Sequence, residues 1–225
     1  MYFFSFSLIR LSGEKMKNKK QIILKEIQKN KYKYIFLSTI VLIGFITGFI
    51  FSNILSYSDH QAISEVLKKY FLGIKNNLDI NYLGNFLNTF SINYLYMILI
   101  WVFGISIIGI ILNPFILYFK SFIIGFSCGI IISVYSYLGI LGSILYIFPH
   151  LLINLIIYIL LSFYGMKLSI LLFKSLFLKK QFNFPDFMKK YLKILLFSGV
   201  ILLISAIYET FLSNFVMKLF TIFLK

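Results

Sequence analysis

The sequence predicts an all-α integral membrane protein, a bundle of five transmembrane helices with the N-terminus inside and the C-terminus outside. Three observations predict it. Hydrophobic residues make up 60% of the 225 residues and charged residues only 13%, unlike a soluble domain. Five apolar runs are long enough to cross about 30 Å of hydrocarbon, which takes roughly 20 helical residues. The 22 Lys and Arg lie mainly between these runs, where they indicate topology.

The segment before the first run, residues 1–33, is basic and is predicted to be cytoplasmic. Residues 1–15 are predicted to result from a mis-called start, because Gly13-Glu14-Lys15-Met16 reads like a translated ribosome-binding site followed by the natural initiator. The alternative is an extra interfacial segment. Residues 1–11 are apolar but too short to span, and they lack the basic start of a signal peptide.

The membrane domain, 34–225, contains the five predicted spans. They cover residues 34–55, 94–117, 121–137, 142–164 and 194–213. Asn113-Pro114 and Lys120 are expected to separate the second span from the third, since proline disrupts a helix interior and a charge is costly in a bilayer. A tight turn, with Gly139 and Gly142 providing backbone freedom, is expected between the third and fourth.

The two longer connections differ in charge. Segment 56–93 balances its lysines with acidic residues and is predicted to be an extracytoplasmic loop, whereas the lysine-rich 165–193 is predicted to be a cytoplasmic loop. The second loop is either an extension of the fourth helix or an interfacial helix with snorkelling lysines. A sixth span there is disfavoured because it would place the C-terminus inside, against the charge asymmetry.

Part of the outside loop has the periodicity of an amphipathic helix. Its apolar positions recur at helical spacing: Ile63, Val66, Leu67, Tyr70, Phe71 and Ile74. Such a stripe must bury against something. It lies on the membrane interface, caps its own bundle, or forms a docking surface for an extracytoplasmic partner.

Small residues recur at every fourth position in two spans. They are Gly44, Gly48 and Ser52 in the first, and Ser121, Gly125, Gly129 and Ser133 in the third. This spacing lines one ridge of a helix and predicts close helix packing. It does not distinguish a contact within the chain from one between copies in a homo-oligomer.

Polar residues inside two spans also need partners. The fourth span carries a ridge of Tyr146, His150, Asn154, Tyr158 and Ser162, and the fifth carries the lone acid Glu209. His150 lies roughly 12 Å below the outer face and Glu209 climbs roughly 22 Å of a 30 Å core, so both are in the outer half. A hydrogen bond from Glu209 to His150 or Tyr146 is open. An interfacial Glu209 near Lys218, or a proton relay, are the alternatives.

Several functional classes are disfavoured. One cysteine and two histidines make a zinc site hard to assemble. The sequence contains no H-E-x-x-H, G-x-S-x-G, Walker or dinucleotide-binding motif. The cations flank apolar runs and do not form a nucleic-acid patch. We therefore predict no enzymatic activity, no cofactor, no metal and no nucleic-acid partner, with membrane lipid as the surrounding partner.

Several short motifs resemble the stage II sporulation protein M family. They are Trp101-Val-Phe-Gly104-Ile-Ser106-Ile-Ile-Gly109, Asn113-Pro114, Lys120-Ser121, Gly125-Phe126-Ser127-Cys128-Gly129, Phe148-Pro149 and Tyr208-Glu209-Thr210-Phe211-Leu212-Ser213. The resemblance covers nearly the whole chain from Met16 on. The chain departs from the family at Ser121, Asn154 and Asn214, where the family often has glycine, a polar or acidic residue, and proline.

The resemblance implies a non-enzymatic membrane scaffold of sporulation engulfment. Such a scaffold would recruit and localise peptidoglycan hydrolases, stage II sporulation proteins P and D, in the mother cell plasma membrane at the asymmetric septum. Under this interpretation the apolar stripe of 63–74 belongs to the docking surface, and Glu209 with the polar ridge fixes helix register. The rival hypothesis is a small permease or channel that uses the polar ridge.

Overall fold

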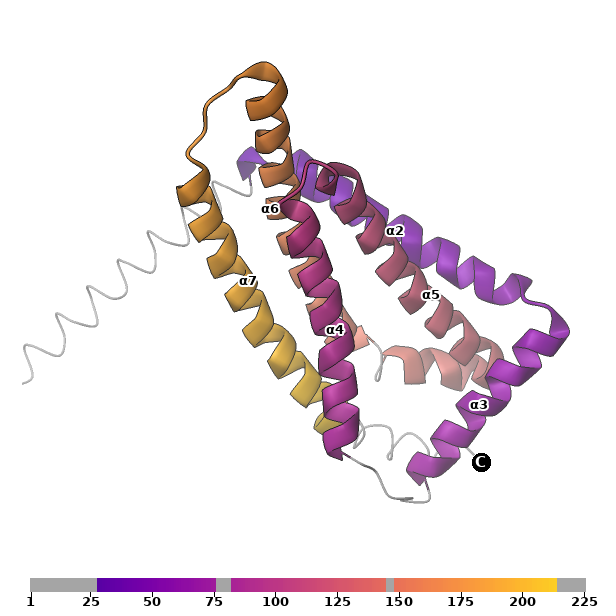
Figure 1. The fold of residues 1–225 in the computed structure, drawn as a ribbon. Helices are drawn as coiled ribbons and strands as arrows, with labels where there is room; N and C mark the ends of the chain where they lie inside the picture. The colour runs from indigo at the N-terminus through magenta and orange to yellow at the C-terminus, as the bar shows by residue number, and fades with distance from the viewer. Residues whose placement is uncertain (1–27, 76–81, 145–147, 214–225) are drawn as a thin grey trace, which may run out of the picture. The chain divides into compact units, whose positions relative to one another are not determined.

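The computed structural model describes residues 28–75, 82–144 and 148–213 (Figure 1). This part of the chain contains six α-helices, a π-helical turn and no strand. The elements are α2 (Lys31–Ile54), α3 (Tyr57–Lys75), α4 (Tyr82–Gly104), α5 (Gly109–Gly142), α6 (Phe148–Leu178), α7 (Phe184–Ile207) and the π-helical η2 (Tyr208–Ser213). The packing described below lies within the compact unit 37–225.

Five of these helices are long and apolar enough to cross a membrane: α2, α4, α5, α6 and α7. The prediction of an all-helical protein with five spans is therefore confirmed. Its inside-to-outside orientation stays a prediction. The start of the chain, with its predicted initiator Met16, lies outside the described residues.

The boundary between the second and third spans was predicted wrongly. The break is at residues 105–108, between α4 and α5, and not at Asn113-Pro114 or Lys120. Pro114 lies in the second turn of α5, where neighbouring helices can satisfy the backbone that proline leaves unpaired. Lys120 is only 8% exposed inside the bundle and has partners there, so its charge does not force a helix end.

The second span also begins earlier than predicted. Helix α4 starts at Tyr82, so residues 82–93 are helical and not part of a loop. The polar residues in this stretch resembled a connection. Asn93 is in fact buried at the centre of the bundle, where a polar side chain is tolerated because it has hydrogen-bond partners.

The turn after α5 differs from the expected glycine turn. The helical path breaks at Ser136, which has φ 51° and ψ −126°, and residues 137–142 are helical again. Gly139 serves close packing, because a Cβ there would overlap the carbonyl oxygen of Ile131. Its role is therefore steric, and the unusual backbone angle is on a serine.

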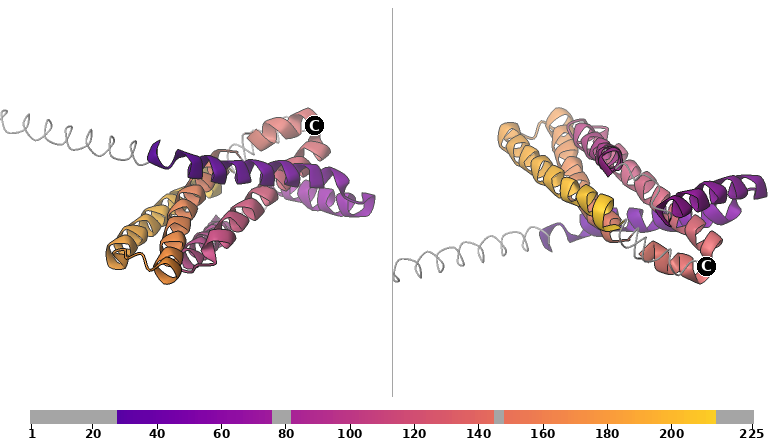
Figure 2. Two further views of the ribbon diagram at one scale, coloured as in Figure 1. Left: turned by 90° about the horizontal axis from the view of Figure 1, so that it is seen from above. Right: turned by 90° about the horizontal axis from the view of Figure 1, so that it is seen from below.

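The fourth and fifth spans form a helical hairpin whose members lie side by side (Figures 1 and 2). Helix α6 continues to Leu178, which is the helical extension among the predicted alternatives for 165–193. Helix α7 starts ten residues before the predicted Ile194. The reason is local: Asn183 caps it by accepting a hydrogen bond from the Asp186 N–H, and Pro185 occupies its first turn.

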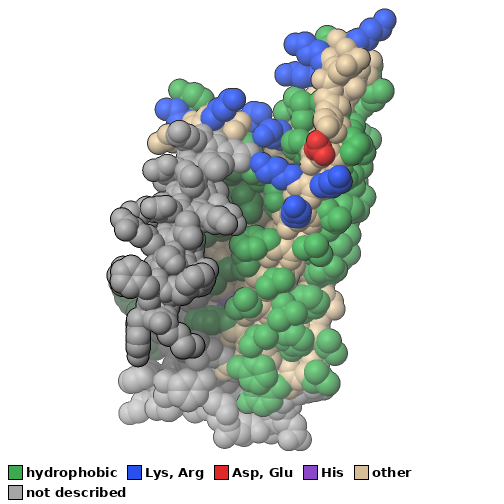
Figure 3. Space-filling model, turned by 90° about the vertical axis from the view of Figure 1, so that its left-hand side faces the viewer, with side chains coloured by type: hydrophobic (Ala, Val, Ile, Leu, Met, Phe, Trp, Pro, Cys, Tyr) green, Lys and Arg blue, Asp and Glu red, His purple; other side chains and the backbone are tan. Residues whose placement is uncertain are grey.

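Lysines gather around this hairpin connection. Figure 3 shows Lys and Arg side chains concentrated at one end of a face that is otherwise hydrophobic. Lys174, Lys179, Lys180, Lys189, Lys190 and Lys193 are all exposed here. Lys190 also lies 4.9 Å above the Tyr164 ring, and such a cation–π contact anchors a snorkelling side chain.

The core is formed where α4, α5, α6 and α7 pack against one another. On α7 the buried residues recur every three or four positions: Tyr191, Leu195, Ser198, Leu202 and Ser205. The opposite face of α7 exposes Leu196, Val200 and Ile204. An exposed apolar face on a spanning helix is the face that lipid covers.

Candidate functional site

The two predicted glycine ridges lie against each other. A Cβ on Gly48 would overlap the carbonyl oxygen of Phe122, and one on Gly125 would overlap that of Phe45. Gly44 meets the Tyr118 carbonyl in the same way, and Gly129 meets the Ser52 hydroxyl. Ser121 donates a hydrogen bond to the Val41 carbonyl at 2.5 Å. The structure thus places Gly44, Gly48, Ser121, Gly125 and Gly129 at a contact between α2 and α5 within one chain.

A buried polar network is centred on Asn93 of α4. Its side-chain oxygen accepts hydrogen bonds from Lys120 Nζ of α5 and Tyr158 OH of α6, each at 3.2 Å. The Tyr158 hydroxyl also reaches the Asn93 carbonyl at 3.0 Å. All three residues are less than 10% exposed. One carboxamide therefore connects three membrane-spanning helices.

This network lies near the middle of the membrane. Asn93, Lys120 and Tyr158 are each ten or eleven residues from the start of their helices, which corresponds to about 15–16 Å along a helix axis. That is roughly half of a 30 Å hydrocarbon core. The Lys120 ammonium is compensated there by Asn93 and by the Tyr96 ring, 4.3 Å from Nζ. Its cost in the bilayer is thus reduced by three contacts on neighbouring helices.

A second polar group closes the other end of the hairpin. His150 Nε2 lies 3.5 Å from Glu209 Oε2, and Thr89 of α4 donates a hydrogen bond to Glu209 Oε1 at 3.2 Å. Ser205 donates to the His150 carbonyl at 3.3 Å. The carbonyls of this region and η2 bring Glu209, 22% exposed, against α4 and α6. Glu209 and Lys120 are also close enough for their charges to attract.

The polar ridge of α6 faces inward along its described length. Asn154 and Tyr158 are 0% exposed and His150 is 4% exposed. The Asn154 side chain has no hydrogen-bond partner among the described residues. The Tyr146 side chain lies outside the described residues. The ridge therefore joins the Asn93 network to the Glu209 group through buried positions of a single helix.

A third contact brings the end of α4 against α6 and α7. The Cα atoms of Gly104 and Gly165 are so close that a Cβ on Gly104 would lie 2.6 Å from the Gly165 Cα. Tyr191 fills the adjacent space, and its hydroxyl donates to the carbonyls of Ile100 and Trp101 at 3.4 and 3.3 Å. Ser169 donates to the Gly104 carbonyl at 3.1 Å. The free carbonyls at the end of α4 are thus capped by side chains of α6 and α7.

The predicted docking stripe lies on α3, partly against the bundle. Leu67 packs on a cluster formed by α5 and α6 that includes Ile131 and Leu155, and Ile63 is half-buried. Val66, at the edge of the stripe, is 69% exposed. The side chains of Tyr70, Phe71 and Ile74 lie outside the described set. One face of α3 therefore caps the bundle and one edge is left uncovered.

A hydrogen bond that the sequence did not predict fixes α3. His60 Nε2 lies 2.8 Å from Ser133 Oγ of α5. Because the Ser133 hydroxyl donates to the Ile130 carbonyl, its oxygen acts as the acceptor and the imidazole as the donor. His60 was not singled out from the sequence, since a single histidine in a polar loop carries no pairing information.

Sequence reasoning also missed Thr89, Asn93, Lys120 and Tyr191. Their common signal is a polar group within or beside an apolar run. For Lys120 and Asn93 that signal was interpreted as a connection between helices. Only the neighbouring helices show that each polar group has a buried partner.

The chemistry that this arrangement can support is limited to hydrogen bonding and charge compensation. No group of three metal-ligating side chains occurs within residues 28–75, 82–144 and 148–213. Cys128 is buried among apolar side chains. The acid, the histidine and the lysine bind to one another or to neighbouring amides and hydroxyls.

The fold and the site together define a multi-pass membrane protein whose intramembrane polar groups hold its helices in register. The family model for stage II sporulation protein M matches residues 15–214. The chain therefore belongs to the stage II sporulation protein M family, as the sequence motifs predicted. No curated protein and no solved structure matches the chain.

Proposed function

We propose that this protein is a non-enzymatic membrane scaffold of sporulation engulfment. In this proposal it resides in the mother cell membrane at the asymmetric septum and recruits peptidoglycan hydrolases there, with stage II sporulation proteins P and D as partners. The observation that carries the proposal is the family match over residues 15–214. The bundle supports it, because its polar groups connect helices to one another in the manner of a rigid frame.

Helix α3 is the proposed docking element. It follows the first span, and its predicted location is outside the cell membrane. Val66 exposes 69% of its surface beside residues that pack on the bundle. An exposed apolar side chain on a helix that is itself held in place is a suitable anchor for a partner, because little conformational entropy is lost on binding.

A charge at Val66 tests this docking. We expect Val66→Asp to leave the chain in the membrane and to weaken co-purification of the two hydrolases about tenfold, since burying a valine contributes roughly 1.5 kcal/mol or more. Gln61→Asp is the matched control, because Gln61 is also exposed on α3 and gains the same charge. Equal recovery of the hydrolases with Val66→Asp and with the wild type would reject α3 as the docking element.

The permease hypothesis is retained as the second candidate because of the buried polar groups. Lys120, His150 and Glu209 lie at membrane depth, where ionisable residues often mark transport pathways. In proteoliposomes a permease would show solute or ion flux that Glu209→Gln abolishes while the fold is retained. Absence of flux through the wild-type protein would remove this candidate.

A further inference from the structure

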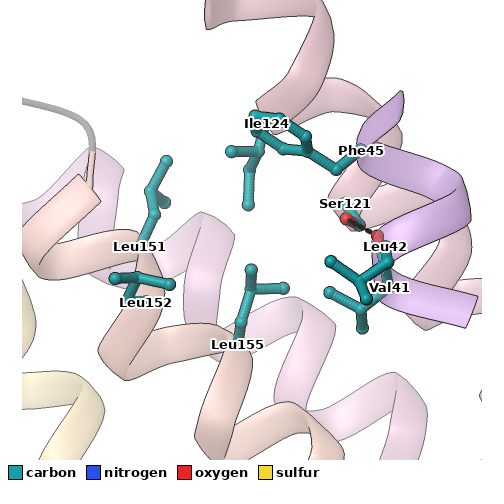
Figure 4. A pocket seen from close by; sticks show the side chains of 8 residues that line it. All are labelled: Val41, Leu42, Phe45, Ser121, Ile124, Leu151, Leu152 and Leu155. Carbon is teal, nitrogen blue, oxygen red and sulfur yellow. Dashed lines mark hydrogen bonds between the residues drawn. The ribbon is translucent and has the colours of Figure 1, made fainter. Parts of the chain in front are cut away.

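An apolar cavity of about 200 Å³ lies between α2, α5 and α6 (Figure 4). Eight residues line it: Val41, Leu42, Phe45, Ser121, Ile124, Leu151, Leu152 and Leu155. None of them has a role in the polar network or in the proposed docking by α3. The cavity is therefore a separate feature of the bundle.

The cavity lies deep in the membrane. Val41 is ten residues from the start of α2 at Lys31 and thirteen from its end at Ile54, or about 15 Å and 20 Å along the axis. This is close to the middle of a hydrocarbon core about 30 Å thick. Any occupant therefore comes from the bilayer interior and not from water.

The lining offers no polar group to a ligand. Its one hydroxyl, on Ser121, already donates to the Val41 carbonyl (Figure 4). The remaining side chains are aliphatic or aromatic. An apolar cavity of this kind does not hold ordered water, because a buried water needs two or more polar partners.

The cavity has a buried floor and an exposed rim. Ile124 and Leu155 are 6% and 8% exposed, whereas Leu42 and Leu152 at the rim are 62% and 47% exposed. The rim residues belong to the outer surface of two membrane-spanning helices, α2 and α6. That surface is in contact with lipid tails, so lipid tails are the molecules that can enter.

Its size indicates which part of a lipid fits. The volume exceeds the roughly 150 Å³ of an engineered apolar cavity that binds benzene. It is below the roughly 300 Å³ at which sites for whole drug-sized ligands begin. A partner helix, about 10 Å across, is too wide for it. A segment of one flexible hydrocarbon chain fits, and it would gain van der Waals contacts that a void lacks.

We propose that this cavity is a binding site for one acyl chain of a membrane phospholipid, which inserts between Leu42 of α2 and Leu152 of α6. The bound chain fills the space between these two helices, each of which packs on α5. The lipid is thus a structural component of the bundle. This proposal does not depend on the scaffold function.

Native mass spectrometry of the full chain tests the proposal. The chain is purified in mild detergent, stripped of lipid, and titrated with dioleoylphosphatidylglycerol. We expect one phospholipid per chain to remain bound after detergent exchange. Val41→Phe, which fills the cavity from α2, is expected to lose that phospholipid. Val200→Phe is the matched control, because Val200 is 60% exposed on the lipid-facing side of α7, and it is expected to keep it.

Two results would overturn the proposal. One is a wild-type chain that retains no phospholipid, or that instead carries the mass of a second copy or another polypeptide removable by Val41→Phe. The other is equal phospholipid retention by Val41→Phe and the wild type, which would place the lipid elsewhere. Circular dichroism verifies folding of each variant. If Val41→Phe does not fold, Leu152→Phe fills the same cavity from α6 and is judged by the same outcomes.

Discussion

Replacing Asn93 by leucine is expected to destabilise the bundle more than removing the buried charge of Lys120. Asn93 Oδ1 accepts from both Lys120 Nζ and Tyr158 OH at 3.2 Å. In Asn93→Leu the Tyr158 hydroxyl keeps the backbone carbonyl of residue 93, at 3.0 Å. The Lys120 ammonium loses its only side-chain acceptor found among the described residues and keeps the Tyr96 ring. The cost of the substitution therefore falls mainly on the buried cation.

The magnitude follows from the partners that remain. Removing one member of a buried charged pair typically costs about 3–5 kcal/mol, and the cation–π contact recovers roughly 1–2 kcal/mol of that. We expect Asn93→Leu to lower the free energy of unfolding by about 2–3 kcal/mol. Lys120→Met removes the charge while Tyr158 still satisfies Asn93, so it should change stability by less than about 1 kcal/mol, because an apolar replacement of a buried ion is often neutral or better.

The double variant provides the decisive comparison. Asn93→Leu with Lys120→Met should resemble Lys120→Met alone, which gives a coupling energy of about 2 kcal/mol. Reversible unfolding of the purified chain by sodium dodecyl sulfate in mixed micelles, followed by circular dichroism, measures each free energy. Lys174→Met is the control, since Lys174 is exposed near the end of α6. If Lys120→Met is as destabilising as Asn93→Leu, or if the two effects add, the reasoning is refuted.

Three further perturbations test other contacts. Gly48→Ala should lower stability by about 1–3 kcal/mol in the same assay because its Cβ meets the backbone of Phe122, whereas Gly73→Ala, with open space around it, should be neutral or slightly stabilising; equal effects would contradict the α2–α5 packing. Tyr191→Phe should cost about 1 kcal/mol through the lost bonds to the end of α4, and an unchanged thermal unfolding midpoint would argue against that cap. Reporter fusions after residue 225 should be active outside the membrane, as the lysine distribution predicts, and a cytoplasmic signal would reverse the topology.

The number and length of the spans could be predicted from the sequence alone. Hydrophobicity accumulates along a segment and needs no knowledge of neighbours, so five long apolar runs were sufficient to indicate five helices. The small-residue ridges were also visible, because their four-residue spacing is a property of a single helix. Their partner was not, since spacing alone does not say which helix approaches Gly48.

The boundaries were the least predictable feature. Lys120 and Asn93 resemble connection residues when each is considered by itself, because an isolated charge or carboxamide is costly in a bilayer. Inside the bundle they bind each other and the Tyr158 hydroxyl, and that removes the cost. The same holds for Glu209, whose partners Thr89 and His150 come from two other helices.

The sequence by itself thus determined that the chain enters the membrane, how often it crosses, and which family it belongs to. The tertiary structure decided where α4 ends, which polar groups compensate one another, and where an apolar cavity remains between α2 and α6. The physical reason is that insertion depends on the apolar surface of one segment, whereas the energy of a buried polar group depends on atoms that distant segments bring within about 3 Å of it.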